Sequence, residues 1–406
     1  MRILLLNHYY WPDVSGNAQY GTQLAEDLAA AGMEVHAIAS RGDYLGERQE
    51  PLPSEESRNG VSIHRIPVTN LGKKTPWQRI GDAMSFHLMA FLRALRLPKP
   101  DVIVAQTAPL LAVTPAAVLA MLRRSRLVIW CQDVWPDIAF ALNLFRKKSF
   151  SGRIFRTISY ASMRRADRVV AIGRCMHEYL VQRVRLRPER IVLQQNWGDS
   201  IHLAPVPREE NGFRRRLGLA GKLVILYSGN MGWGHPFESI MEVARRLRED
   251  DRVRFLFIGG GQRRPFIENY LETHRLTNAV LLPYQPGEAL AESLSAGDIH
   301  LISLDERLDG LIVPSKLYAA LAVGRPVVFL GSAHNEVAYV LEECRCGVRI
   351  DPVDVDGLER TIREAVENPG RWDEMGRRGY EHFRPKYSRE TGTASFVRIL
   401  RSLDGR

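Results

Sequence analysis

The sequence predicts an α/β protein with two domains, each a doubly wound parallel sheet covered by helices on both faces. Short apolar runs alternate with stretches of helical periodicity in both halves of the chain, which is typical of βαβ units. The length of 406 residues fits at least two domains of ~100–200 residues each. A proline-containing stretch with little periodicity, 196–221, separates the halves. We therefore expect domains at 1–197 and 198–388, followed by a C-terminal helix at 389–406.

The first half opens with a short apolar strand, a glycine-containing loop and a helix at 23–31, which ends at Gly32. A long amphipathic helix is expected at 79–95. The predicted strands of this half are 2–6, 34–39, 61–66, 101–105, 127–131, 169–172 and 191–193.

The second half repeats this plan, with a helix at 238–247 between its first two strands. Its predicted strands are 223–227, 253–258, 279–282, 299–302, 327–329 and 348–350. Open sheets of this kind bind ligands at the carboxyl ends of their strands. Two such sheets facing each other leave a cleft there, and we expect the active site in that cleft.

The composition is that of an ordinary globular protein. With 45% hydrophobic and 25% charged residues, the chain is excluded from the disordered, collagen and coiled-coil classes. Four cysteines are too few for a disulfide scaffold and indicate a reducing compartment. The first apolar run is too short for a signal-peptide core, and the longest, 108–122, falls short of the ~20 residues that span a bilayer. We expect a cytoplasmic protein.

Positive charge is concentrated in one part of the chain. Residues 73–187 contain 21 basic and 6 acidic side chains, within a whole chain of net charge +10. Such a field attracts an anionic partner, although solubility alone is the competing explanation. No zinc, homeodomain or RNA-recognition signature accompanies it, which favours an anionic membrane surface over nucleic acid. Lys147, Lys148 and Arg153 are the candidate acceptor or membrane patch.

The first candidate site is a loop that enters a helix at Pro314 and Ser315, followed by Lys316 and Leu317. Proline and serine suit a helix start, where free N–H groups can bind a phosphate. A lysine in the first turn opposes the helix dipole, so its position suggests an anion that balances it. A capped core helix with one exposed lysine is the equally weighted alternative.

Other candidates for donor binding follow strands or lie in glycine-containing loops. A glycine without a side chain lets the backbone approach a phosphate closely. The run 259–261 does not have the G-x-G-x-x-G spacing, so no nicotinamide site is predicted there. The candidates of this group are Gly16, Asn17, Gly229, Asn230, Gly261 and Tyr284.

Two carboxylates in the basic half are candidates for proton transfer. Asp133 and Asp137 follow a predicted strand, and either could accept the proton of an attacking hydroxyl. Asp133 is the stronger candidate, and with Lys316 it completes the predicted catalytic pair. Capping of the next helix is the alternative role for both aspartates.

No metal site is predicted. Asp354 and Asp356 match an Asp-x-Asp pattern but read as the start of a helix. Cys344 and Cys346 lack further ligands at zinc spacing, and the 11 histidines are scattered without an H-E-x-x-H motif.

Motifs in the same order along about residues 1–330 resemble the family 4 retaining glycosyltransferases. The branch of the colanic-acid and O-antigen enzymes is the most similar. The run PSKLYAALAVGRPVVF resembles the donor-site helix of this branch, and WCQDVWPDIAF its Gln-Asp-x-Trp-Pro-Asp segment. Further matching segments are NHYYWPDVSGNAQY, QQNWGD, LYSGNMGW, FIGGGQRR and AGDIHLISL. The resemblance implies a GT-B fold, in which two Rossmann-like domains face a central cleft and the C-terminal helix crosses back onto the N-terminal domain.

The resemblance also implies an activity. Family members transfer a sugar from a nucleotide-sugar, here with UDP as the favoured nucleotide, with retention of anomeric configuration. The C-terminal domain would hold the donor and the N-terminal domain the acceptor. We expect a polyprenyl-diphosphate-linked glycan as acceptor, at the inner face of the cell membrane, in bacterial surface polysaccharide biosynthesis. The nucleotide-sugar is a substrate, and neither a cofactor nor a metal is expected.

The chain departs from the family pattern at two donor-site glutamates, which align with Leu311 and Ala319. The carboxylates just upstream that could replace the first are Asp305, Glu306 and Asp309. Two other functions therefore stay open. One is a nucleotide-sugar epimerase of the same architecture, and the other is a non-catalytic scaffold that binds a nucleotide-sugar.

Overall fold

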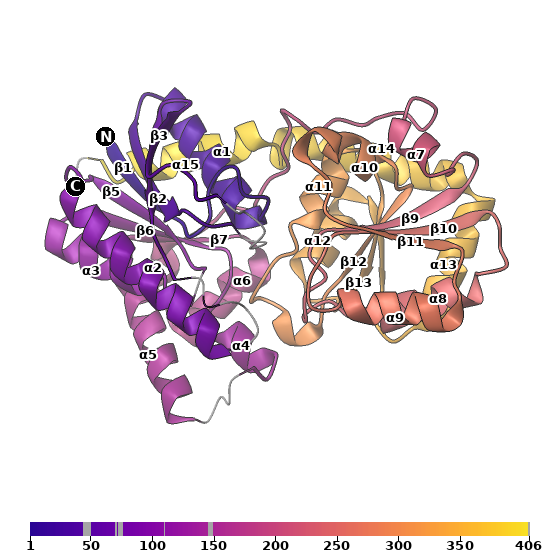
Figure 1. Cartoon of the computed structure of the whole chain (residues 1–406), viewed down its shortest axis with the longest axis horizontal. Helices are drawn as coiled ribbons and strands as arrows, with labels where there is room; N and C mark the ends of the chain where they lie inside the picture. Colours follow the sequence, from indigo (N-terminus) through magenta and orange to yellow (C-terminus); the bar gives the residue numbers. More distant parts are fainter. Residues whose placement is uncertain (44–49, 70, 72–75, 109, 145–148, 405–406) are drawn as a thin grey trace. The chain divides into compact units, whose positions relative to one another are not determined.

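The computed structural model describes residues 1–43, 50–69, 71, 76–108, 110–144 and 149–404, which form two compact units (Figure 1). Unit 1 comprises Met1–Gln195, Gly310–Val313 and Gly392–Arg406, and unit 2 comprises Asn196–Asp309 and Pro314–Thr391. Each unit is built around one sheet with helices on both faces (Figure 1).

The sheet of unit 1 has the strand order β3-β4-β2-β1-β5-β6-β7-β8. All neighbouring strands are parallel except β3, which pairs antiparallel with β4. The bounds are β1 Arg2–Leu6, β2 Glu34–Ser40, β3 Glu55–Arg58, β4 Val61–Ile66, β5 Val102–Gln106, β6 Arg126–Cys131, β7 Arg168–Ala171 and β8 Ile191–Leu193. Val, Ile and Leu dominate the central strands because helices bury both faces of a parallel sheet.

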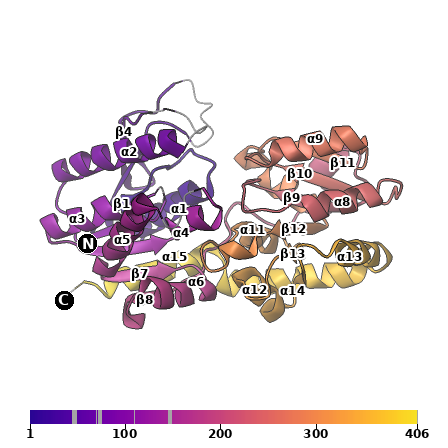
Figure 2. The same ribbon diagram turned by 90° about the horizontal axis from the view of Figure 1, so that it is seen from below.

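Helices α1 and α15 cover one face of this sheet, and α2, α3 and α5 cover the other (Figures 1 and 2). Phe396 of α15 packs against Trp130 of β6, with ring centroids 4.7 Å apart. The helices in the first part of the chain are α1 Gly16–Ala30, α2 Pro76–Arg96, α3 Val113–Arg123, α4 Asp137–Ala141, α5 Phe150–Arg165 and α6 Arg174–Tyr179, and α15 is Arg389–Arg401. A π-helical turn, Leu180–Val184, and a 3₁₀ turn, Pro188–Arg190, follow α6.

The sheet of unit 2 has six parallel strands in the order β11-β10-β9-β12-β13-β14. Their bounds are β9 Leu223–Ser228, β10 Val253–Ile258, β11 Ala279–Leu282, β12 Ile299–Ser303, β13 Val327–Leu330 and β14 Gly347–Ile350. This is the doubly wound order, because the chain adds strands on one side of β9 and then returns to add them on the other.

The helices of unit 2 bury a core rich in aromatic side chains, which includes Tyr227, Phe237, Phe255 and Phe257. The helices are α7 Gly212–Arg216, α8 Glu238–Arg246, α9 Arg264–His274, α10 Leu290–Ser295, α11 Lys316–Ala322, α12 Glu336–Cys344, α13 Val355–Glu367 and α14 Pro369–Lys386, with 3₁₀ turns at Gly287–Ala289 and Glu306–Leu308. Among the described residues, no helix combines the length and the apolar character needed to cross a bilayer.

Candidate functional site

The crevice expected in unit 2 lies where the strand order reverses. β9 stands between β10 and β12. Because crossovers between parallel strands are right-handed, the connections that leave β9 and β12 run to opposite faces of the sheet. Such a point leaves the carboxyl ends of the two strands open to a ligand. The residues that follow β9 begin with Gly229 and Asn230, so the topology brings these two predicted residues to the open edge.

The loop after β9 and the loop after β10, which both contain glycines, pack against each other at this edge. Met231 N donates a 2.7 Å hydrogen bond to Gly260 O, and Arg263 N donates a 2.8 Å bond to Met231 O. Gly261 has a φ of +132°, and a Cβ there would lie 2.5 Å from Asn230 Oδ1. Only glycine therefore permits this approach. The predicted residues Asn230 and Gly261 are in direct contact.

Lys316 reaches the same loops from the first turn of α11. Its Nζ donates a 3.2 Å hydrogen bond to Asn230 O and lies 4.9 Å from the ring centroid of Tyr227. A Cβ at Gly229 would lie 2.9 Å from Lys316 Cε, so the glycine makes room for the lysine chain. Within the described part of the chain, no carboxylate pairs with this ammonium group. Burial lowers the pKa of Lys316 to about 7, because no negative charge compensates the lost hydration.

The residues around Lys316 differ in what they offer a ligand. Ser315 is exposed and its side chain makes no capping hydrogen bond, and α11 has only seven residues. The side chain of Leu317 is fully buried in the core. Pro314 is also buried. Among the residues 314–317, Lys316 is thus the one that presents a charged group to the β9 loop.

Tyr284 follows β11 and lies over the glycine loop after β10. Its hydroxyl is 3.5 Å from Gly260 O, and a Cβ at Gly260 would lie 3.2 Å from its ring. The side chain is half-buried, so part of the ring remains open to solvent. A flat ring at the edge of a crevice offers a stacking surface for another aromatic group.

A hydrogen bond from His235 connects the loop after β9 to strand β12. Its Nδ1 forms a hydrogen bond with Ser303 O, and the ring is buried. Burial, with a smaller contribution from the positive charge of Lys316, lowers the pKa of His235 to about 3. The ring is therefore neutral at physiological pH. Its role is to position the loop.

The acidic residues after β12 have different environments. Asp305 forms an ion pair with Arg307 and also accepts a hydrogen bond from Arg307 N, so its oxygens are occupied. Asp309 accepts a 2.7 Å hydrogen bond from Asn335 Nδ2, and Asn335 itself is buried. Burial raises the pKa of Asp309. Asp309 is the better placed carboxylate for a polar ligand, since no lysine or arginine among the described residues forms an ion pair with it.

Unit 1 has its own crevice, where β1 lies between β2 and β5. Asn7 Nδ2 donates a 2.9 Å hydrogen bond to Asn17 O, and Gln106 Nε2 donates a 3.3 Å bond to the same oxygen. Gly16 is the first residue of α1. The predicted residues Gly16 and Asn17 thus lie at the carboxyl ends of β1 and β5. Asn7 and Gln106 were not predicted, although a polar residue at the end of an apolar strand is a signal that identifies such positions.

Asp133 lies in unit 1, two residues after β6. Its N–H donates a 3.0 Å hydrogen bond to Thr107 Oγ1, and its backbone forms an antiparallel bridge with Ile312 of the same unit. Its carboxylate accepts no hydrogen bond and pairs with no cation among the described residues. Burial raises the pKa of Asp133 to about 6. Asp137, by contrast, is buried and accepts a 2.9 Å hydrogen bond from Tyr160 Oη.

The predicted basic patch is only partly described. Lys147 and Lys148 lie outside the described residues. Arg153 is exposed on the first turns of α5. The described residues contain no group of three or more side chains that could hold a metal ion.

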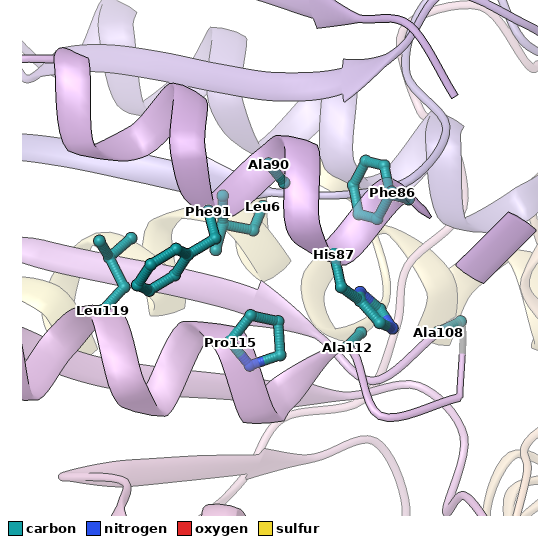
Figure 3. A pocket seen from close by; sticks show the side chains of 9 residues that line it. All are labelled: Leu6, Phe86, His87, Ala90, Phe91, Ala108, Ala112, Pro115 and Leu119. Atoms are coloured by element: carbon teal, nitrogen blue, oxygen red, sulfur yellow. The ribbon is translucent and has the colours of Figure 1, made fainter. Parts of the chain in front are cut away.

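A small pocket in unit 1 lies between α2, α3 and the end of β1 (Figure 3). Its lining is apolar except for His87, whose ring points toward the loop before α3 (Figure 3). His87 Nε2 lies 2.7 Å from Leu110 O, and burial lowers the pKa of His87. The neutral ring donates to that carbonyl. Because no charged group lines this pocket, it does not match the chemistry of a diphosphate.

Comparisons with known proteins agree with this architecture. Residues 15–197 match the glycosyl transferase 4-like domain family, and residues 222–368 match the glycosyl transferases group 1 family. The putative colanic acid biosynthesis glycosyl transferase WcaI of Escherichia coli K12 is 28% identical over 381 residues, which cover 91% of this chain and 93% of that protein.

Solved structures show the same fold at low sequence identity. Sucrose-phosphate synthase from Thermosynechococcus elongatus has a TM-score of 0.79 at 16% identity, over 99% of both chains. HepE of Anabaena, solved with UDP and glucose, has a TM-score of 0.76 at 14% identity, over 99% of this chain and all of the other. The chain therefore belongs to the family 4 glycosyltransferases and has their GT-B fold, as the sequence predicted.

Proposed function

We propose that this glycosyltransferase moves a sugar, with retention, from a UDP-sugar to a polyprenyl-diphosphate-linked glycan in bacterial surface polysaccharide biosynthesis. The family membership supports the reaction class. The role of WcaI in colanic acid biosynthesis, as its name states, supports the acceptor class. The environment of Lys316 carries the proposal for the donor site, because a half-buried ammonium group with no carboxylate partner in the described part of the chain is suited to bind an anion.

The donor diphosphate would lie over the β9 loop of unit 2. Lys316 would contact its phosphate oxygens. Gly229 makes room for the lysine chain and Gly261 lets the loop after β10 pack on Asn230, so the two glycines would keep the lysine and the loops in place beneath the diphosphate. As the glycosidic bond to the leaving diphosphate breaks, negative charge grows on that group and the lysine stabilises it. The ring of Tyr284 would stack on the base. The UDP complex of HepE, a protein of the same fold, favours UDP as the nucleotide.

Asp309 would bind the transferred sugar. It lies after β12, at the same open edge as Gly229, and Asn335 fixes its position. A carboxylate held in this way accepts hydrogen bonds from sugar hydroxyls. It would thereby fill the role of the glutamate that the family pattern has and this chain lacks.

The acceptor would bind to unit 1, with Asp133 close to the attacking hydroxyl. A carboxylate with a pKa of about 6 is ionised at neutral pH and still basic enough to accept a proton in the transition state. Retention follows if the hydroxyl attacks from the same face that the diphosphate leaves. The leaving phosphate oxygen then holds the attacking hydroxyl on that face by a hydrogen bond, and Asp133 takes the single proton that is released as the new glycosidic bond forms. The diphosphate leaves with the electron pair of the broken bond, and no covalent enzyme intermediate is needed.

Binding of nucleotides to Lys316 variants tests the donor site. Thermal unfolding is followed for the wild type, Lys316→Ala and Lys222→Ala with a panel of nucleoside diphosphates and nucleotide-sugars. Lys222 is the matched control because it pairs with Asp251 at the surface of the same unit. At a concentration a hundredfold above Kd, UDP and one UDP-sugar should raise the melting temperature of the wild type and of Lys222→Ala by about 5 °C or more. The melting temperature of Lys316→Ala should not rise. Equal shifts in Lys316→Ala would contradict the proposed site.

A further inference from the structure

The ammonium group of Lys316 has two partners among the described residues, one a backbone oxygen and the other an aromatic ring. Its Nζ donates a 3.2 Å hydrogen bond to Asn230 O and lies 4.9 Å from the ring centroid of Tyr227. A cation within ~6 Å of such a centroid is attracted by the negative face of the ring, and more strongly where water is excluded. The ring of Tyr227 therefore compensates part of the hydration that the buried charge has lost.

Tyr227 also acts on the first partner of the lysine. Its hydroxyl donates a 2.8 Å hydrogen bond to Asn230 O, the same oxygen that accepts from Lys316 Nζ. A carbonyl oxygen has two lone pairs and can accept both bonds at once. Both groups that stabilise the ammonium are thus supplied or held by one tyrosine.

The tyrosine itself is fixed by the core of unit 2. It lies on β9 and is fully buried. Its ring packs in T-shaped arrangements against Phe237, with centroids 4.7 Å apart, and against His235, with centroids 6.2 Å apart. Because interiors of proteins are close-packed, the ring cannot turn away from the lysine without opening this core.

The titratable groups that face Lys316 keep their protonation state near neutral pH. Burial, with a smaller contribution from Tyr284, raises the pKa of Tyr227 well above its usual value, so its hydroxyl keeps the proton. His235, with a pKa of about 3, is neutral. Of Lys316, Tyr227 and His235, only the lysine titrates between about pH 5 and 9, and its pKa reports how well its charged form is stabilised.

We propose that Tyr227 is a positioning residue for Lys316: its ring stabilises the ammonium form, and its hydroxyl fixes the carbonyl that orients the ammonium group. The inference rests on the proposed function for the role of Lys316 in donor binding, and it adds how the chain keeps a half-buried lysine charged without a carboxylate. An apolar side chain at this position would leave the charge with a single, less firmly held partner, and the neutral amine would be favoured.

The pKa of Lys316 in the full chain without nucleotide tests the role of the ring. It is measured from the Cε chemical shift of isotope-labelled lysine, and the resonance is identified by its absence in Lys316→Arg. We expect the midpoint to fall by about one pH unit in Tyr227→Leu and to stay within a few tenths in Tyr227→Phe, which keeps the ring. Phe255→Leu is the matched control and should leave the midpoint unchanged, because Phe255 is a fully buried aromatic residue of the same core, on β10.

A shape-preserving replacement covers the case in which Tyr227→Leu does not fold. Trifluorophenylalanine at position 227 keeps the volume of phenylalanine, but its fluorine atoms withdraw the negative charge from the face of the ring. The Lys316 midpoint should then fall by about half a pH unit or more relative to Tyr227→Phe. Equal midpoints in the wild type, Tyr227→Leu and the fluorinated variant would overturn the inference. So would an equal fall in Phe255→Leu, because a loosened core would then be the cause.

UDP binding at several pH values tests the role of the hydroxyl. Tyr227→Phe should raise Kd about threefold at every pH without moving the midpoint of the profile, because the carbonyl of Asn230 is no longer held. An unchanged Kd would contradict that role. The measurement of the Lys316 pKa contains no nucleotide. A protein that fails to bind UDP therefore leaves the contact between the two side chains standing, and unchanged midpoints leave the donor site standing.

Discussion

Two ionisable side chains in this protein are partly buried and have no oppositely charged partner among the residues that the structure describes. Lys316 in unit 2 and Asp133 in unit 1 both have pKa values shifted toward neutrality by burial. Keeping such groups costs folding free energy, because each loses hydration without a compensating ion pair. Groups of this kind are enriched at functional sites, and here they are the proposed contact to the donor and the proposed base.

If Lys316 binds the donor as proposed, its protonation should make donor binding depend on pH. Its pKa of about 7 means that the free protein loses this charge as the pH rises above 7. A nucleotide-sugar keeps the charge of its diphosphate over this range, so its Kd should rise about tenfold between about pH 6.5 and 8.5. Arginine stays charged, and Lys316→Arg should therefore show a nearly flat profile. Calorimetric titration with UDP-glucose at several pH values measures both. A flat profile for the wild type would show that Lys316 does not contact the diphosphate.

Replacement of Asp133 should separate stability from activity. Its folded-state pKa of about 6 lies above the usual value of about 4, so this carboxyl destabilises the folded state increasingly as the pH rises from 4 to 6. Asp133→Asn removes that penalty and should stabilise the protein above pH 6 by up to about 3 kcal/mol. Transfer should fall by about 10²-fold or more if the carboxylate is the base. Denaturant unfolding and a transfer assay at pH 7 measure both effects. A variant that is more stable and fully active would rule out the catalytic role.

At the scale of elements, the loops proposed to bind the donor contain glycines that their backbone geometry requires. Gly261 has φ of +132° and no space for a Cβ against Asn230 and Met231. Gly261→Ala should therefore destabilise unit 2 by about 1–3 kcal/mol and weaken UDP binding. Gly287→Ala is the control, since nothing lies within 4 Å of the added Cβ. Unfolding curves with and without UDP compare the two. Equal behaviour of the two variants would mean that the loops adjust freely.

Most strands could be predicted from the sequence, and the reason is physical. Strands buried on both faces are continuous apolar runs, so β10 was predicted at its observed bounds, Val253–Ile258. The hairpin strand β3 was missed, since Glu55–Arg58 is polar and half exposed. Asn59 and Gly60, both with positive φ, form the hairpin turn, and the Asn-Gly pair is a signal that could have found it.

The start of α1 shows why a helix end that lies next to a candidate site is harder to predict than a buried strand. The sequence predicted this helix from residue 23, but it begins at Gly16. Residues 16–22 have no apolar period because they pack on polar groups at the end of β1. Gly21 is required there, since a Cβ would lie 2.5 Å from Asn7 Nδ2. Likewise, the sequence shows a lysine at 316 and an aspartate at 133, whereas only the fold reveals that both are partly buried and have no oppositely charged partner among the described residues.

At the scale of the whole molecule, the C-terminal helix stabilises the unit formed by the start of the chain. Phe396 of α15 is fully buried and packs on Trp130. Phe396→Ala should lower the stability of unit 1 by about 3–5 kcal/mol. Because nucleotide binding is proposed for unit 2, the variant should still bind UDP. Calorimetric unfolding with UDP present and absent measures both properties. Loss of UDP binding in a variant that remains folded would contradict the assignment of the donor to unit 2.

At this scale, the positive charge of the chain and its exposed apolar side chains are concentrated in the same segment. The sequence predicted an anionic partner from the basic stretch 73–187. That stretch contains α2, α3 and α5, so the same segment supplies arginines and exposed apolar side chains. The sequence indicates apolar helix faces in this segment, but helical periodicity alone does not tell which apolar face packs on the sheet and which is exposed.

The most direct test of the account is sugar transfer itself. The full chain is incubated with a radiolabelled UDP-sugar and a polyprenyl-diphosphate-linked glycan, and label is measured in the lipid extract and in the nucleotide-sugar pool. The account predicts labelled lipid with the wild type and Lys222→Ala, and little or none with Lys316→Ala or Asp133→Asn. A donor converted to a different nucleotide-sugar without acceptor would indicate an epimerase. Bound but unreacted donor, across the panel of nucleotide-sugars, would indicate a scaffold, and either result would contradict the proposed transfer.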